Sequence, residues 1–77
     1  MKVKIYSTPY CVYCRMAKEF FDKNNIGYEE IDVTKSDAAV EEMKTKSHQM
    51  GVPVIEIDGQ IFVGFNRMEI GKFLKLA

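Results

Sequence analysis

Two strand-like runs separated by one helix-like segment constrain the fold of this chain more than any other feature. Residues 3–6 (VKIY) and 28–33 (YEEIDV) are rich in β-branched and aromatic side chains, which favours strands. Between them, Pro9 interrupts the pattern, and the apolar spacing is helical from Cys11 to about Asn25. Because a helix that connects two strands forms a right-handed crossover, this order predicts a parallel strand pair.

A second helix is predicted over roughly residues 37–47, with Ser36 or Asp37 as its cap. The glycine that usually follows a helix is absent, and His48 stands in its place. We expect His48 to adopt the left-handed conformation, because histidine is among the residues that tolerate positive φ. The expected buried positions of this helix are Ala39, Val40 and Met43.

A β-hairpin is predicted in the second half of the chain. The runs VPVIEI (residues 52–57) and QIFVG (residues 60–64) are rich in β-branched side chains and are joined by Asp58 and Gly59. A two-residue Asp-Gly connection is the strongest short-range signal of a hairpin. The sequence therefore predicts two antiparallel strands here.

The last helix is predicted to begin at Asn66, because Glu69 three residues later completes a pattern much like a capping box. Ile70, Phe73 and Leu74 then form its apolar stripe. The element order β-α-β-α-β-β-α predicts an α/β fold, in which three helices cover a four-stranded mixed sheet within one domain, residues 1–77. The side chains assigned to the core are Phe20, Phe21, Met43 and Phe73.

The composition argues against several classes of function. The chain of 77 residues has 11 basic and 11 acidic side chains, so no basic stripe offers a face for nucleic acid. No apolar run approaches the ~20 residues of a membrane-spanning helix, and the N-terminal segment lacks the apolar stretch of a signal peptide. We therefore expect a cytoplasmic protein that binds neither nucleic acid nor membrane, and we also expect it to be a monomer.

The chain's two cysteines, Cys11 and Cys14, lie two residues apart where the first helix is predicted to begin. Backbone N–H groups at a helix start lack helical partners and the helix dipole is positive there, which favours a thiolate. The pKa of Cys11 should therefore lie below the ~8.5 of a free cysteine. We expect Cys14 one turn deeper, as a protonated thiol placed to attack a mixed disulfide at Cys11.

A C-x-x-C motif beside a strand–helix–strand pattern in a cytosolic chain is typical of thioredoxin-like redox proteins. A zinc site, a structural disulfide and an incidental pair each fit the motif less well. Tetrahedral zinc needs four ligands, and Cys11, Cys14 and His48 fall short of that number unless two chains share a site. A structural disulfide would close a very short loop and restrict the unfolded chain little. An incidental pair would not account for the strand–helix setting.

Pro53 adds to the redox interpretation. It lies in GVPV, just before the first hairpin strand, where a cis peptide bond after Val52 would turn the backbone toward the helix start. In that arrangement, the main chain of Val52 would pair with an extended substrate backbone, as a short added strand does.

These features together resemble the glutaredoxin family, over essentially the whole chain. IYSTPYCVYC (residues 5–14) is similar to the family's first strand and C-P-Y-C site, and GVPVIEIDGQIFVG (residues 51–64) to its T-V-P segment and hairpin. The resemblance implies a thioredoxin-like fold and a thiol–disulfide oxidoreductase, with Cys11 as nucleophile and Cys14 as resolving cysteine. Its substrates would be protein or glutathione mixed disulfides, with glutathione as co-substrate and with no tightly bound cofactor or metal.

The family's glutathione-binding residues carry over only in part. Thr8 stands where a basic residue is common, and Val12 where the family has proline. The family's G-G-[S/T/C]-D stretch corresponds to residues 63–66 (VGFN), which keep a glycine and a capping side chain but lack the acidic charge. The positions implied as contacts for glutathione or substrate are Thr8, Tyr13, Lys46, Gln49, Val52, Pro53, Gly64, Phe65 and Asn66.

CVYC and VGFNR also resemble the glutaredoxin-like redoxins that carry electrons from thioredoxin reductase and NADPH to ribonucleotide reductase. The donor that resets the cysteines is therefore either glutathione or thioredoxin reductase. Two non-catalytic hypotheses stay open beside the oxidoreductase. One is a module that binds a peptide or glutathione with incidental thiols, and the other is a carrier that holds an iron–sulfur cluster between two chains.

Overall fold

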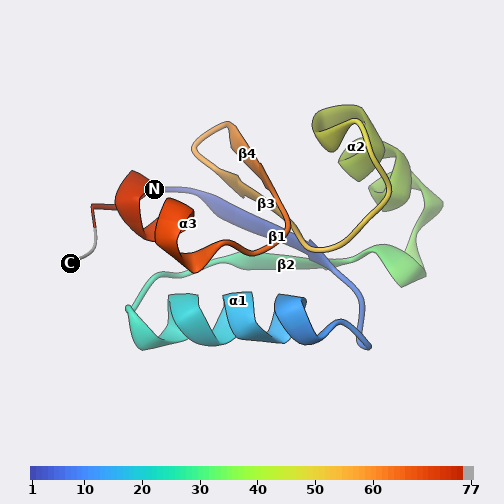
Figure 1. Cartoon of the computed structure of the whole chain (residues 1–77). Coiled ribbons are helices and arrows are strands. Elements are labelled where there is room, and N and C mark those ends of the chain that lie inside the picture. The colour runs from blue at the N-terminus through green and yellow to red at the C-terminus, as the bar shows by residue number, and fades with distance from the viewer. Residues whose placement is uncertain (76–77) are drawn as a thin grey trace.

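A computed structural model describes residues 1–75 of the chain (Figure 1). The elements are β1 (Val3–Ser7), α1 (Val12–Lys23), β2 (Glu29–Asp32), the 3-10 helix η1 (Val33–Lys35), α2 (Asp37–Ser47), β3 (Val54–Ile57), β4 (Gln60–Val63) and α3 (Arg67–Phe73). The predicted order of strands and α-helices is confirmed, with η1 as an added short helix.

The strands form one four-stranded mixed sheet in the order β2-β1-β3-β4. β1 and β2 are parallel, as the crossover through α1 predicts, whereas β3 is antiparallel to both β1 and β4. Tyr6 of β1 pairs with Ile31 of β2 on one side and with Val54 of β3 on the other. This register places the loop that follows β1 and the segment that precedes β3 at the same end of the sheet.

Helices cover both faces of the sheet, and each face has its own apolar core. The core under α1 and α3 consists of Val3, Ile5, Ala17, Phe21, Ile55, Ile57, Phe62 and Ile70. The core under α2 consists of Tyr6, Val33, Met43 and Val54. Figure 1 shows α1 and α2 on opposite sides of the sheet. The predicted α/β architecture, with three α-helices on a mixed sheet, is therefore confirmed.

Local sequence signals determine where the helices begin and end. The Ser36 hydroxyl accepts the backbone N–H of Ala39 at 3.2 Å, so Ser36 is the N-cap of α2. The side-chain carbonyl of Asn66 likewise accepts the N–H of Glu69 at 3.0 Å and caps α3. His48 ends α2 with a φ of 60°, in the expected left-handed conformation.

The hairpin turn also has the predicted geometry. Asp58 and Gly59 have φ values of 48° and 90°, and a two-residue turn of this kind requires a positive φ at both positions. The strand β3 begins at Val54, directly after Pro53, so the valine and proline that open the run of residues 52–57 precede the strand.

The end of the second strand and the position of Phe73 differ from expectation. The strand predicted over residues 28–33 ends at Asp32, because the Asp32 carboxylate accepts the Thr34 N–H at 2.9 Å and turns the chain into η1. Phe73 is 44 % exposed, so its assignment to the core is wrong. It lies in the last turn of the short helix α3 and covers the edge of Phe62, with ring centroids 5.3 Å apart.

Candidate active site

Cys11 and Cys14 lie at the N-terminal end of α1. Cys11 is the N-cap residue, with an extended backbone (φ −93°, ψ 114°), rather than a residue of the first helical turn as the spacing indicated. Its Sγ accepts the backbone N–H of Cys14 at 3.1 Å. The Cys11 sulfur thus receives one of the N–H groups that a helix start leaves without a helical partner.

The sulfur atoms of Cys11 and Cys14 are joined in a disulfide, and their Cα atoms are 5.2 Å apart. Cys14 is fully buried on the same face of α1 as Ala17 and Phe21, whereas Cys11 is partly exposed. A reagent from solvent therefore meets the sulfur of Cys11 first. This difference in exposure is what the roles of attacking and resolving cysteine require.

The peptide bond between Val52 and Pro53 is cis, as the sequence indicates. Pro53 directly precedes Val54, which pairs with Tyr6 near the end of β1. The register therefore places Pro53 at the end of the sheet from which the chain continues to the cysteines. The Pro53 carbonyl accepts the N–H of Gly64 at 2.8 Å, which ties the end of β4 to this segment.

The residues next to the cysteines are mostly apolar and exposed. Tyr10 is 89 % exposed and Tyr13 is 61 % exposed, so both rings are open to a partner. Thr8 is partly buried, and its carbonyl accepts the backbone N–H of Cys11 at 3.4 Å. The substrate contacts assigned to Thr8 and Tyr13 stay predictions.

Gly64, Phe65 and Asn66 form the turn from β4 to α3. Gly64 has a φ of 80°, a conformation that favours glycine. The ring of Phe65 packs against Phe20 of α1, with centroids 5.7 Å apart. The structure thus assigns a local role to each of the three residues, and their contacts with glutathione stay predictions.

Lys46 and Gln49 already have partners within the chain. The Lys46 ammonium donates to Glu56 at 2.6 Å, and to both Glu42 and the Tyr6 hydroxyl at 3.2 Å. The hydrogen bond to Glu56 raises the pKa of Lys46. The Gln49 amide donates to a backbone carbonyl two residues later at 3.1 Å. A glutathione carboxylate would therefore compete with two carboxylates for Lys46, and both predicted contacts stay untested.

A second polar cluster lies at the end of β1 that leads to the cysteines. The Glu30 carboxylate of β2 accepts hydrogen bonds from the Lys18 ammonium of α1 at 2.8 Å and from the buried Ser7 hydroxyl at 2.9 Å. These two donors, Lys18 first, lower the pKa of Glu30. The cluster ties β1, β2 and α1 together beside the start of the site loop.

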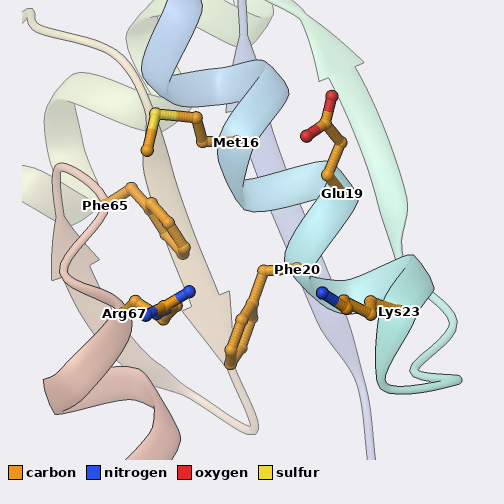
Figure 2. A pocket seen from close by; sticks show the side chains of 6 residues that line it. All are labelled: Met16, Glu19, Phe20, Lys23, Phe65 and Arg67. Carbon is orange, nitrogen blue, oxygen red and sulfur yellow. The ribbon is translucent and has the colours of Figure 1, made fainter.

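A groove of about 310 Å³ lies between α1 and the turn into α3 (Figure 2). It is lined by Met16, Glu19, Phe20, Lys23, Phe65 and Arg67. The groove was not predicted from the sequence because Phe20 was assigned to the core, whereas Phe20 is only partly buried. The sequence feature that could have predicted the groove is the i, i+4, i+8 spacing of Val12, Met16 and Phe20, which forms an apolar stripe on α1.

Neither a metal-binding cluster nor a membrane-spanning helix is found in the part of the chain that the structure describes. Within residues 1–75, no three His, Cys, Asp or Glu side chains are grouped so that they could hold a metal ion. Over the same range, no helix has both the length and the apolar character needed to span a membrane.

Known proteins match this chain over most of its length. Residues 3–63 match the glutaredoxin family model. An uncharacterized glutaredoxin-like 8.6 kDa protein in the rubredoxin operon of Clostridium pasteurianum is 47 % identical over 73 residues, covering 95 % of this chain and 97 % of that protein. The glutaredoxin-like protein NrdH of Lactococcus lactis is 33 % identical over 73 residues, covering 91 % and 96 % respectively.

A solved structure is also similar to this chain in fold. The crystal structure of a mutant thioredoxin-like protein has a TM-score of 0.90 and 33 % identity, covering 99 % of this chain and 97 % of that one. The fold and the C-x-x-C pair at the start of α1 thus define a small redox protein with a thioredoxin-type fold. Within that class, the chain belongs to the glutaredoxin family, as its sequence motifs implied.

Proposed function

We propose that this protein is a thiol–disulfide oxidoreductase in which Cys11 attacks and Cys14 resolves. The observation that carries the proposal is the position of Cys11 as the cap of α1, with the Cys14 N–H 3.1 Å from its sulfur. A helix start favours a thiolate, and the thiolate is the species that attacks a disulfide. The burial of Cys14 supports the second role, because it keeps that thiol from competing for substrate.

The reaction begins with the reduced protein. The Cys11 thiolate attacks one sulfur of a substrate disulfide, a Cys11–substrate disulfide forms, and the other substrate sulfur leaves as a thiolate that takes up a proton. Cys14 then loses its proton and attacks the Cys11 sulfur, which releases the second substrate thiol. Two electrons pass from the protein to the substrate, and the product is the Cys11–Cys14 disulfide that the structure contains.

The first candidate substrate class is protein or glutathione mixed disulfides, with glutathione as the reductant that resets the protein. Family membership and the position of the Val52–Pro53 segment at the end of the sheet that leads to the cysteines support it, because an extended backbone could pair there. We further propose that the protein acts in the cytoplasm as a monomer. The reducing conditions of that compartment would return Cys11 and Cys14 to the dithiol form that attacks the substrate.

The second candidate is a redoxin that thioredoxin reductase resets. This candidate is supported by the residues that correspond to the family's glutathione contacts. Lys46 already donates to Glu56 at 2.6 Å, and neither Thr8 nor Asn66 carries a charge. The 33 % identity with a glutaredoxin-like NrdH protein agrees with this candidate.

Parallel reduction of the oxidised protein by two donor systems tests the proposal and separates the candidates. One system is glutathione with glutathione reductase, and the other is thioredoxin reductase with NADPH. Reduction by either donor system supports the oxidoreductase, and the system that reduces the protein faster identifies its electron donor. If neither reduces the disulfide, and peptide or glutathione binding survives in Cys11→Ser/Cys14→Ser, the binding-module hypothesis replaces the enzyme. Iron that co-purifies with a dimer would favour the cluster carrier.

A further inference from the structure

We propose that the groove between α1 and α3 binds an acidic segment of the protein whose disulfide Cys11 attacks. This inference rests on the proposed function, and it specifies the substrate as a polypeptide with an apolar side chain near its disulfide and carboxylates farther away. Figure 2 shows Met16 toward one end of the groove, the rings of Phe65 and Phe20 beyond it, and Arg67 and Lys23 on either side of Phe20.

Both walls of the groove are continuous with the site. One wall is α1, where Met16 lies nearer than Phe20 or Lys23 to the helix start that Cys11 caps. The other wall begins at Phe65, next to the glycine whose N–H is bonded to the Pro53 carbonyl at 2.8 Å. A chain bound at the cysteines can therefore continue into the groove, and it meets the apolar end first.

The apolar end can take up a side chain from a partner. Met16 is 44 % exposed, and the facing rings of Phe20 and Phe65, 5.7 Å apart between centroids, are only partly buried. Covering these three side chains removes apolar surface from water, which favours an aliphatic or aromatic residue of the partner at this position.

The far end of the groove is cationic and calls for an acidic partner. Lys23 and Arg67 face it, and a hollow of about 450 Å³ that shares both residues adds Lys72. Within residues 1–75, none of these three cations forms an ion pair or a side-chain hydrogen bond, although Lys4, Lys18 and Lys46 all do. Glu19 is the single acidic residue lining the two hollows. Carboxylates on the substrate would complement this charge.

Two synthetic peptides test the inference. In both, a cysteine is held as a mixed disulfide with 2-mercaptoethanol and is flanked on each side by Leu; the outer residues are Glu in one peptide and Lys in the other. The measured quantity is the second-order rate constant with the reduced protein. We expect the Glu peptide to react about tenfold faster at low salt, and the difference to shrink as salt screens the charges.

A charge-reversed variant and a matched control assign the preference to the groove. Lys23→Glu/Arg67→Glu should abolish or reverse the preference for the Glu peptide. Lys35→Glu/Lys44→Glu makes the same change in net charge on η1 and α2 and should keep the preference. All three proteins should reduce the neutral bis(2-hydroxyethyl) disulfide at equal rates, because this molecule carries no charge for the exchanged side chains to attract or repel.

The inference is overturned if the wild-type protein does not distinguish the peptides, or if the Lys23→Glu/Arg67→Glu variant distinguishes them equally well. Absence of reaction between the wild-type protein and the neutral disulfide would instead refute the proposed function.

The groove can then be tested independently of the redox reaction, by fluorescence anisotropy with a labelled Glu peptide that has Ser in place of Cys. Binding that does not weaken in the groove variant would refute the inference independently.

Discussion

The backbone N–H of Cys14 donates to the sulfur of Cys11 at 3.1 Å, so the first turn of α1 closes on the side chain of its own cap. That first turn contains no acidic residue, and the positive end of the helix dipole is therefore not neutralised locally. The relationship links the fold to the proposed chemistry, because the residue that caps the helix is also the one that we propose as the nucleophile.

Val12 offers a direct test of this electrostatic effect. It is 61 % exposed in the first turn of α1, so Val12→Glu should fold normally while it places a negative charge beside the Cys11 thiolate. We expect the pKa of Cys11 to lie below ~8.5 in the parent protein and to rise in Val12→Glu, but not in the uncharged control Val12→Gln. Ultraviolet absorbance of the thiolate against pH, measured in the reduced Cys14→Ser background, gives these values. A Cys11 pKa at or above the free-cysteine value in the parent would contradict the expectation.

Lys46→Met should destabilise the protein. Glu56 loses the ammonium that contacts it at 2.6 Å, and because its side chain is only 21 % exposed, its carboxylate would be left partly buried without that partner. The expected loss is about 1–3 kcal/mol in the free energy of unfolding, measured by urea denaturation. Lys44→Met, at an exposed position of the same helix, is the control and should change it little. Equal stability of the two variants would show that the Lys46 contacts contribute nothing to folding.

Glu30 should contribute to the pH dependence of stability. Lys18 and Ser7 lower its folded pKa below the ordinary 4.5, so the folded state binds this proton less readily than the unfolded chain does. Its contribution is therefore present above that ordinary value and is lost as the pH falls through the lowered pKa. Glu30→Gln should show a smaller loss of stability than the parent between about pH 5 and about pH 3. The Lys18–Glu30 pair is partly exposed, so the difference should stay within about 1 kcal/mol. Parallel curves for parent and variant would argue against this role.

Two phenylalanines of the helices on one face of the sheet should differ sharply in their contribution to stability. Phe21→Ala removes a fully buried ring from the core under α1 and should cost about 3–5 kcal/mol. Phe73→Ala removes a ring that is 44 % exposed and that contacts the ring of Phe62. We expect this change to lower the free energy of unfolding by about 1 kcal/mol or less. Thermal unfolding of both variants checks this order, and a larger loss for Phe73→Ala would contradict the burial seen here.

Signals that act over a few residues were sufficient to predict much of the fold. The Asp58-Gly59 turn, the Ser36 cap and the left-handed His48 each depend on the conformational preferences of their own backbone, so their structure follows from the local sequence. The order of these elements then left few ways to arrange one sheet, because crossovers are right-handed and hairpins are antiparallel.

Features that depend on contacts between distant segments could not be predicted in this way. Phe21 and Phe73 are both apolar residues at helical spacing, and the element that packs on each one determines which is buried. Lys46 was assigned to glutathione by family resemblance, but the packing of α2 on the sheet brings Lys46 within 2.6 Å of Glu56 of β3. The groove likewise exists only because the turn at Phe65 lies against Phe20 of α1.

The central claim, that Cys11 attacks first and Cys14 resolves, is tested most directly by trapping the intermediate. Reduced Cys11→Ser and Cys14→Ser are each mixed with an excess of bis(2-hydroxyethyl) disulfide, and adducts are followed over time by mass spectrometry of the intact protein. We predict that Cys14→Ser rapidly accumulates a mixed disulfide at Cys11, while the buried Cys14 of Cys11→Ser reacts far more slowly. Equal rates of adduct formation, or faster reaction at Cys14, would contradict the assignment.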